Sequence, residues 1–374
     1  MMDITKPYFL IMPALISLFL CHFFFFDLSF FVIFNSSLVL VLFAVVCSLL
    51  MYSLGLGRSL AISSSVRLFD RTKRFDGIFL IIVIFSFLSS AFLVLDFVRQ
   101  FGFASIFLNA SLLQKNAISN SLGNFLYLNV FIFPIVFVLS MNRSKLYVLL
   151  LFLSLFFLYF AGIKSYIFQS FALLGLILLS GKRFSSLVFY SFFLFLALFL
   201  YFFVYDVFID LSSDSANHSL DRFLSYYSGS WGTYLFYLVD GLDTPYPGLT
   251  VFYPFYKIVS MGGITLDDYY RFYDVNGFQL NVVPIFQLAY LEGGFSLQLF
   301  LIFFLSFIYV FIRFLCIKFK HNIFFRICLY FYCSTFIISS LFSNVFQDLP
   351  VYISIFLLIL AGIVSQLRLS RRFG

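Results

Sequence analysis

Apolar residues occur along this chain in ten long runs, and polar residues gather in the short segments between the runs. Each run is about 15 to 25 residues long, which is the length that a helix needs to cross a hydrocarbon core of roughly 30 Å. A membrane β-barrel would instead alternate polar and apolar residues in segments of about ten. The pattern therefore predicts an all-α, polytopic membrane protein with about ten transmembrane helices. The runs are Tyr8–Phe26, Leu28–Tyr52, Ile78–Val98, Asn124–Met141, Leu146–Ala161, Tyr166–Ser180, Phe184–Tyr205, Phe295–Ile312, Ile323–Phe342 and Val351–Leu367.

The segment Asp206–Gly294 is the one long polar interruption of this pattern. It separates a seven-span region, residues 1–205, from a three-span region, residues 295–374. It holds nine Asp, one Glu, three basic residues, one His and the chain's only Trp. Because chemistry in water needs such polar groups, we expect the function to lie in this large loop. Its last part, Asn281–Leu291, could also form a re-entrant or interfacial helix.

The basic residues are sorted by side of the predicted membrane. Ten spans place both ends of the chain on one side, and 17 of the 23 Lys and Arg residues fall on that side. Of the 16 acidic residues, only Asp3, Asp70 and Asp76 fall there. An excess of Lys and Arg marks the cytoplasmic side. We therefore expect a multi-pass membrane protein with both termini in the cytoplasm and the large loop on the opposite side.

The composition excludes an ordinary soluble domain. Hydrophobic residues make up 63% and charged residues 10% of the chain, and the mean hydropathy is +1.07, whereas soluble domains carry about 25% charged residues. The net charge of +7 follows from the membrane topology, so we predict no nucleic-acid partner. The five Cys lie in or beside apolar runs, so we expect them to pack there rather than form disulfides.

Several motifs of soluble transferases and hydrolases are absent from the sequence. It has no phosphate-binding loop and no DxD, HExxH, CxxC or GxSxG motif, so we predict no metal site and no cofactor. A group transfer outside the cytoplasm then needs a donor that arrives already activated. A lipid diphosphate is such a donor, because its leaving group is stable.

Arg222 is the first candidate for a catalytic residue. Its planar guanidinium could hold a diphosphate through paired hydrogen bonds; the alternative is an ion pair with a local acid such as Asp221. Glycosyl transfer also needs a base for the proton of the acceptor hydroxyl, and carboxylates do this work in glycosidases. The candidates for the base are His218, Asp221 and Asp240, against the alternative that they only solvate the loop.

Other outward residues could bind the substrate. A phosphate pocket must concentrate positive charge against the acidic background of this face. Trp231 lies among tyrosines at near-helical spacing. That spacing fits rings that stack on sugars, and it fits equally an amphipathic helix in an interfacial aromatic belt. The outward cations besides Arg222 are Arg99, Lys164, Lys257 and Arg271.

Glu292 stands at the outward mouth of the eighth run, directly before Gly293 and Gly294. A carboxylate at that depth is costly unless it is paired or hydrated. The two glycines allow close backbone approach or a bend. We therefore expect either close backbone approach or a bend at the glycines, and a carboxylate that is either paired or hydrated.

The large loop resembles that of the Wzy-type O-antigen or oligosaccharide repeat-unit polymerases. That family has a loop glycine followed by Thr-x-Phe-x-Pro, and later an Asn, a Tyr and an acid–glycine pair that enters the next span. The sequence departs from the family pattern at Pro284, where Thr is frequent, and at Glu292, where Asp is commoner. Arg222 and Gly232 approximate an arginine-centred motif of some members. The matching residues are Gly248, Thr250, Phe252 and Pro254 in PGLTVFYP, and Asn281, Tyr290, Glu292 and Gly293 in NVVPIFQLAYLEGG.

The resemblance implies a polymerase that moves a growing glycan from one polyprenyl diphosphate onto another lipid-linked repeat unit. It also implies that the membrane is the bacterial inner membrane and that the large loop lies in the periplasm. It implies substrate-binding roles for Asn281, Tyr290 and Glu292. The partners would be a polyprenyl-diphosphate-linked oligosaccharide, the lipid bilayer and a chain-length regulator protein. Two alternatives stay open: a lipid-linked oligosaccharide flippase, and an O-antigen ligase that shares the donor and differs in the acceptor.

The predicted topology can be tested with a reporter enzyme that is active only outside the cytoplasm. We expect activity when the reporter follows Ser260 and none when it follows Lys73 or Lys320, because only the first position lies in the periplasmic loop. Activity is measured in whole cells beside the abundance of each fusion. Activity after Lys320 would overturn the arrangement of the last three spans.

Overall fold

The computed structural model describes most of this 374-residue chain. The predicted span Phe184–Tyr205 and the start of the large loop, up to residue 218, lie outside the described residues. The described residues are 3–24, 28–56, 75–108, 123–140, 145–160, 164–180, 219–242, 244, 246–260, 273–275, 278–280, 283–320, 322–341 and 345–370.

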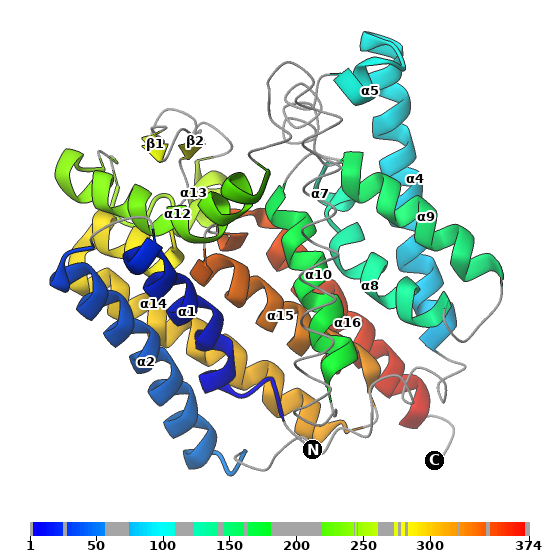
Figure 1. The fold of residues 1–374 in the computed structure, drawn as a ribbon. Coiled ribbons are helices and arrows are strands. Elements are labelled where there is room, and N and C mark those ends of the chain that lie inside the picture. Colours follow the sequence, from blue (N-terminus) through cyan, green and yellow to red (C-terminus); the bar gives the residue numbers. More distant parts are fainter. Residues whose placement is uncertain are drawn as a thin grey trace.

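The described residues form helices and one pair of short strands (Figure 1). Strands β1 (Tyr273–Val275) and β2 (Phe278–Leu280) pair antiparallel within the large loop, a feature that the sequence pattern does not predict. The helices are α1 (Pro7–Phe24), α2 (Phe30–Ser53), α4 (Phe75–Phe101), α5 (Ser105–Leu108), α7 (Gly123–Leu126), α8 (Asn129–Ser140), α9 (Lys145–Phe160), α10 (Lys164–Leu179), α12 (Ser219–Asp240), α13 (Tyr253–Val259), α14 (Ile285–Lys318), α15 (Ile323–Leu341), the 3-10 helix η2 (Val345–Gln347) and α16 (Leu349–Ser370).

Within the described residues, five helices are long and apolar enough to cross a membrane. They are α2, α14, α15, and the segments Gly77–Phe101 of α4 and Leu349–Leu367 of α16. Shorter apolar helices, α1, α8, α9 and α10, fall on further predicted runs. Large apolar side chains such as Ile81, Leu88 and Leu95 stand exposed along one face of α4. Such a face is typical of a surface that contacts a membrane or a protein partner, so the described helices agree with the prediction of a helical membrane protein.

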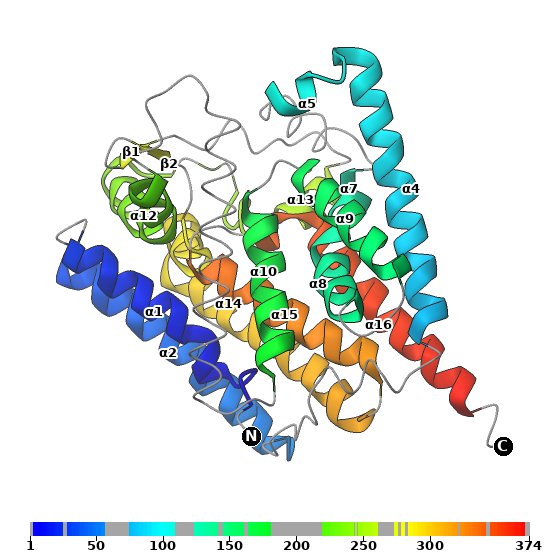
Figure 2. The same ribbon diagram turned by 45° about the vertical axis from the view of Figure 1, so that its right-hand side comes forward.

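Helix α15 is the central element of the bundle, between α14, α10 and α16 (Figures 1 and 2). Nearly all of its side chains are buried. Polar side chains tie it to its neighbours, as expected where packing and interhelical hydrogen bonds hold helices together. Gln169 Nε2 donates to Thr335 Oγ1 at 2.6 Å, and the Tyr332 hydroxyl donates to the Leu305 carbonyl at 2.7 Å.

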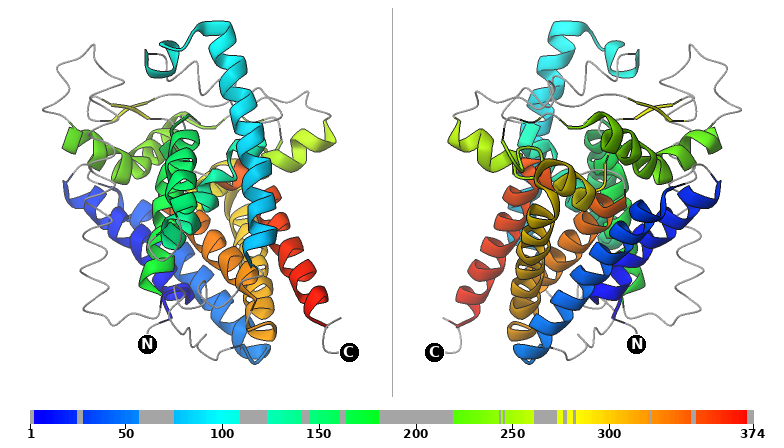
Figure 3. Two further views of the ribbon diagram at one scale, coloured as in Figure 1. Left: turned by 90° about the vertical axis from the view of Figure 1, so that its right-hand side faces the viewer. Right: turned by 90° about the vertical axis from the view of Figure 1, so that its left-hand side faces the viewer.

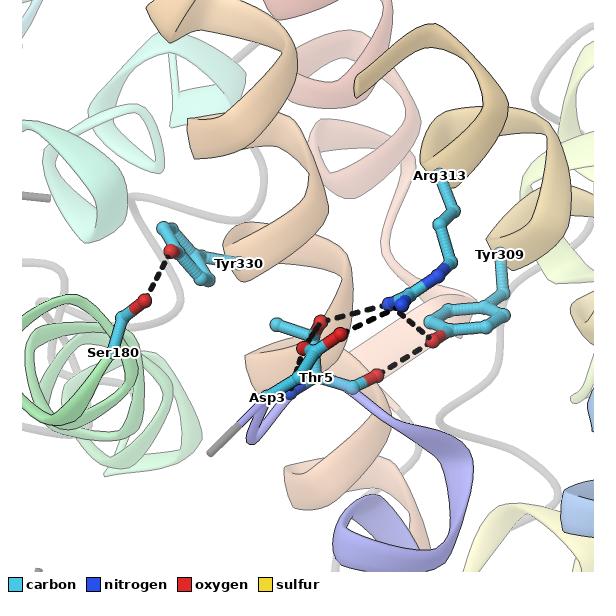
Figure 4. Close-up of polar contacts among 6 residues, drawn as sticks. All are labelled: Asp3, Thr5, Ser180, Tyr309, Arg313 and Tyr330. Atoms are coloured by element: carbon cyan, nitrogen blue, oxygen red, sulfur yellow. Dashed lines mark hydrogen bonds and ion pairs between the residues drawn. The ribbon is translucent and has the colours of Figure 1, made fainter. Parts of the chain in front are cut away.

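A buried ion pair fixes the start of the chain to α14 (Figure 4). Arg313 Nη2 lies 2.7 Å from Asp3 Oδ2, and both side chains are 1% exposed. Thr5 completes the network, since its hydroxyl accepts from Arg313 Nη1 at 3.0 Å and its carbonyl accepts from the Tyr309 hydroxyl at 2.6 Å. A buried pair is tolerated only when further hydrogen bonds satisfy it, and these contacts supply them.

Helix α12 lies across the other end of the bundle, with β1 and β2 beyond it (Figures 1 and 3). The aromatic spacing that predicts a helix here is therefore matched by a helix. Trp231, Tyr234 and Tyr237 are fully buried on its inner face, while Val239 is exposed. Trp231 Nε1 donates to Ser17 Oγ of α1 at 3.2 Å. The aromatic face of α12 is thus turned to protein.

Helix α14 is bent at Gly293 and Gly294, where the backbone leaves helical geometry. Of the two alternatives that the glycines allow, the structure shows the bend, which coincides with the predicted start of the eighth span. Residues 285–289, before the bend, are buried in the protein. Gln298 Nε2 donates across the bend to the Phe286 carbonyl at 3.1 Å. Irregular backbone near a membrane requires such burial and such replacement partners.

Candidate functional site

The chain before α13 forms a tight turn against the bend of α14. Gly248 has a φ of +76°, which lies in the left-handed region that favours glycine. A Cβ on Gly248 would lie 3.2 Å from the Phe252 ring and 3.4 Å from the Leu297 side chain. The turn closes where the Phe252 N–H donates to the Gly248 carbonyl at 2.8 Å. Leu249, Thr250 and Val251 are buried within it.

Glu292 holds this turn onto α14. Its Oε1 accepts from the Thr250 backbone N–H at 2.8 Å, and its Oε2 accepts from the Val251 N–H at 3.4 Å. We call this pair of contacts the Glu292 clamp. Hydrogen bonds from backbone N–H groups to a carboxylate are among the stronger ones in proteins. The sequence predicts a carboxylate that is paired or hydrated, and the clamp pairs it with two backbone N–H groups.

The two glycines after Glu292 make the clamp possible. A Cβ on Gly293 would lie 2.7 Å from the Leu297 Cβ, so a side chain there would force the turn of helix apart. Gly294 has φ +63° and ψ −159°, a conformation that only glycine adopts without strain. The bend turns the end of the short first segment, which carries Glu292, toward the Gly248 turn.

Helix α13 continues from this turn and bridges α14 to α16. The Phe252 ring contacts the Phe304 ring of α14 edge to face, with centroids 5.7 Å apart. The Phe255 ring contacts the Tyr352 ring of α16 at 5.5 Å in the same manner. Offset or edge-to-face rings at these distances are favourable. The Gly248 turn and α13 are therefore fixed over the starts of α14 and α16.

Asp348 lies close to the contact between α13 and α16. It is a candidate that the sequence pattern did not single out. It stands between η2 and α16, one helical turn before Tyr352. The Tyr166 hydroxyl of α10 donates a hydrogen bond to its carboxyl. Burial raises the pKa of Asp348 to about 7, although the hydrogen bond from Tyr166 opposes that rise. One signal could have found it, because Asp348 is the only acidic residue after Glu292.

The structure places the predicted site residues in several settings. Asp240 is exposed at the end of α12, and Arg99 is exposed in the last turn of α4. The Tyr290 ring is partly buried, 6.0 Å from the Phe31 ring. Trp231 is buried against α1, as described above. These four do not converge on one described pocket.

The remaining predicted residues are described only in part. The side chains of Asp221, Arg222, Lys164 and Lys257 lie outside the described residues, although their backbones lie in α12, α10 and α13. Lys164 is two residues before Tyr166, so its backbone lies within a turn of the Asp348 contact. His218, Arg271 and Asn281 lie outside the described residues altogether. In the described part of the chain, no group of three or more metal-binding side chains comes together.

The strained glycine at the bend gives a direct test of this geometry. Gly294→Ala should lower the free energy of unfolding by about 1–3 kcal/mol, because alanine resists that backbone conformation. Gly77→Ala is the matched control: it lies in α4 with ordinary backbone angles and no atom near its added Cβ, so it should not destabilise. Thermal unfolding in detergent compares the two variants. Equal melting temperatures for Gly294→Ala and wild type would contradict the bend.

Comparison with known proteins gives no match. No family model matches this chain, and no curated protein and no solved structure matches it either. The site must therefore be interpreted from its own geometry. The resemblance to Wzy-type polymerases stays a prediction that rests on the residues named for it.

Proposed function

We propose that this chain is a Wzy-type polymerase, a membrane glycosyltransferase that lengthens a lipid-linked glycan. The observation that carries the proposal is the Glu292 clamp. It joins the Gly-x-Thr-x-Phe-x-Pro segment to the acid–glycine pair, the two segments of the resemblance, across 42 residues of sequence. A chance likeness of two short segments gives no reason for them to meet, whereas a shared site does.

The proposed topology has ten spans in a bacterial inner membrane, with a periplasmic large loop and cytoplasmic termini. The described arrangement supports it. The segment at Asp3 and the end of α16 lie at one end of the bundle, and α12 and α13 lie at the other (Figures 1 and 3). An even number of spans requires both ends of the chain on one side. The excess of Lys and Arg among the segments on that side supports the cytoplasmic assignment.

The proposed reaction uses a donor glycan on a polyprenyl diphosphate and an acceptor sugar on a second lipid-linked repeat unit. An acceptor hydroxyl oxygen attacks the anomeric carbon of the donor, and the bond from that carbon to the diphosphate oxygen breaks. The diphosphate leaves with the bonding electrons, so negative charge grows on it. Cations held in place before the reaction stabilise such charge, and each typically contributes about 10²–10³ in rate. Arg222, Lys164, Lys257 and Arg271 are the proposed cations.

The Glu292 clamp has a positioning role in this proposal. It fixes the Gly248 turn and α13 to the bundle, beside the starts of α14 and α16. Substrates bound at this end would then meet groups that are fixed to the bundle rather than carried on a free loop. Positioning of this kind removes entropy from the barrier before the reaction begins.

The proposal is tested by deletion of the gene and analysis of surface glycan on a ladder gel. We expect loss of long chains and accumulation of lipopolysaccharide that carries a single repeat unit, because export and ligation of single units would continue. Plasmid-borne wild type should restore the ladder. A chain-length regulator protein, the proposed partner, should co-purify with the wild-type chain.

Other outcomes distinguish the alternatives. An unchanged ladder after deletion would contradict any polymerase role. Repeat units retained on the inner leaflet would indicate a flippase. Lipid-linked long glycan with none transferred to the lipopolysaccharide core would indicate a ligase.

A further inference from the structure

Asp348 is the only acidic residue that follows Glu292 in the sequence. It follows η2 and begins α16, at the end of the bundle that carries α13. Its main chain is fixed on both sides, since its N–H donates to the Val345 carbonyl and its carbonyl accepts from the Val351 N–H, each at 3.1 Å. The residue as a whole is partly exposed, so it lies near the protein surface, although its carboxyl is buried enough to raise its pKa.

Tyrosines from three segments of the chain lie near this carboxyl. Tyr166 of α10 donates a hydrogen bond to it, Tyr127 after α7 lies near enough to interact with it electrostatically, and Tyr352 does so from the next turn of α16. The Tyr127 and Tyr166 rings meet edge to face, with centroids 4.4 Å apart. The Tyr127 hydroxyl is itself held by Gln169 Oε1 at 2.6 Å. Tyr166 is thus the tyrosine that contacts the carboxyl, and Tyr127 and Tyr352 lie near it.

We propose that Asp348 is the base that accepts the proton of the acceptor hydroxyl, and that Tyr166 is the residue that positions it. This inference rests on the proposed glycosyl transfer. As the acceptor oxygen bonds to the anomeric carbon, its proton passes to the Asp348 carboxylate. The electron pair of the broken carbon–oxygen bond leaves with the polyprenyl diphosphate. The proton and the charge are then balanced without any further reactant.

The other described carboxylates fit this role less well. Both oxygens of Glu292 are engaged by backbone N–H groups. Asp240 is exposed at the end of α12, where water can satisfy it. Burial brings the pKa of Asp348 to about 7, and a base works best when its pKa lies near the working pH. Lys164, a proposed diphosphate cation, also begins the helix that carries Tyr166.

The test measures the initial rate of glycan lengthening against pH. The purified full-length chain, in liposomes, is given lipid-linked repeat units extracted from cells that lack its gene. The wild-type rate should rise with pH through about 7, because the carboxyl must lose its proton to act as a base. Asp348→Asn should lose about 10²-fold or more of the rate, the usual contribution of a general base, and should lose this dependence on pH.

Tyr166→Phe separates a role in catalysis from a role in folding. Removal of its hydrogen bond withdraws support from the charged carboxylate, so the pKa of Asp348 should rise further. The rising limb of the plot of rate against pH should therefore move to higher pH. At pH values above the limb, the variant should keep most of the wild-type rate. Tyr330→Phe is the matched control, because its hydroxyl pairs with Ser180 at the opposite end of the bundle (Figure 4). It should leave the limb in place.

Two results would overturn the inference: Asp348→Asn that keeps a rate within threefold of wild type at pH 8, or Tyr166→Phe with an unmoved limb. The second result counts even if Asp348→Asn fails to fold. Failure of the proposed function looks different, since wild-type protein would then lengthen no repeat units at any pH. Membrane abundance and thermal unfolding of each variant accompany the rates.

Discussion

The contact between Glu292 and the Thr250 and Val251 amides is the interaction on which the α13 end of this bundle depends. A carboxylate at the mouth of a membrane helix needs donors, and a turn with buried amides needs acceptors. The carboxylate accepts the hydrogen bonds of the two amides, so both kinds of group are satisfied. The bend at Gly293 and Gly294 brings the carboxylate to the turn, and the turn then carries α13 across to α16.

The opposite end of the bundle meets the same physical constraint with different residues. Arg313 and Asp3 are both buried, and their network with Thr5 and Tyr309 satisfies most of their hydrogen-bonding groups. The start of the chain is thereby fixed to the same helix, α14, that holds the Gly248 turn at its other end. Helix α14 therefore connects the two polar ends of the molecule through the apolar bundle.

The sequence predicts those features that depend on a single segment of the chain and not on tertiary contacts. A bilayer demands long apolar helices, so the runs predict apolar helices, and the glycine pair allows the bend that the structure shows. The partner of Glu292 could not be predicted, because a backbone N–H carries no mark in the sequence. Trp231 shows the same limit: its spacing predicts a helix, but only tertiary packing buries its ring against Ser17. Asp348 gave no motif in the sequence, and its neighbours Tyr127 and Tyr166 come from distant segments.

Hydrogen exchange at the Thr250 and Val251 amides tests the central claim most directly. In Glu292→Ala, both amides lose a carboxylate acceptor, and such bonds contribute about 1.5–3 kcal/mol. The account therefore predicts exchange that is about 10- to 100-fold faster at these two amides than in wild type. Asp96→Asn, which removes a carboxylate of α4 that pairs with Gln100, should leave both amides unchanged. Equal exchange in Glu292→Ala and wild type would contradict the clamp.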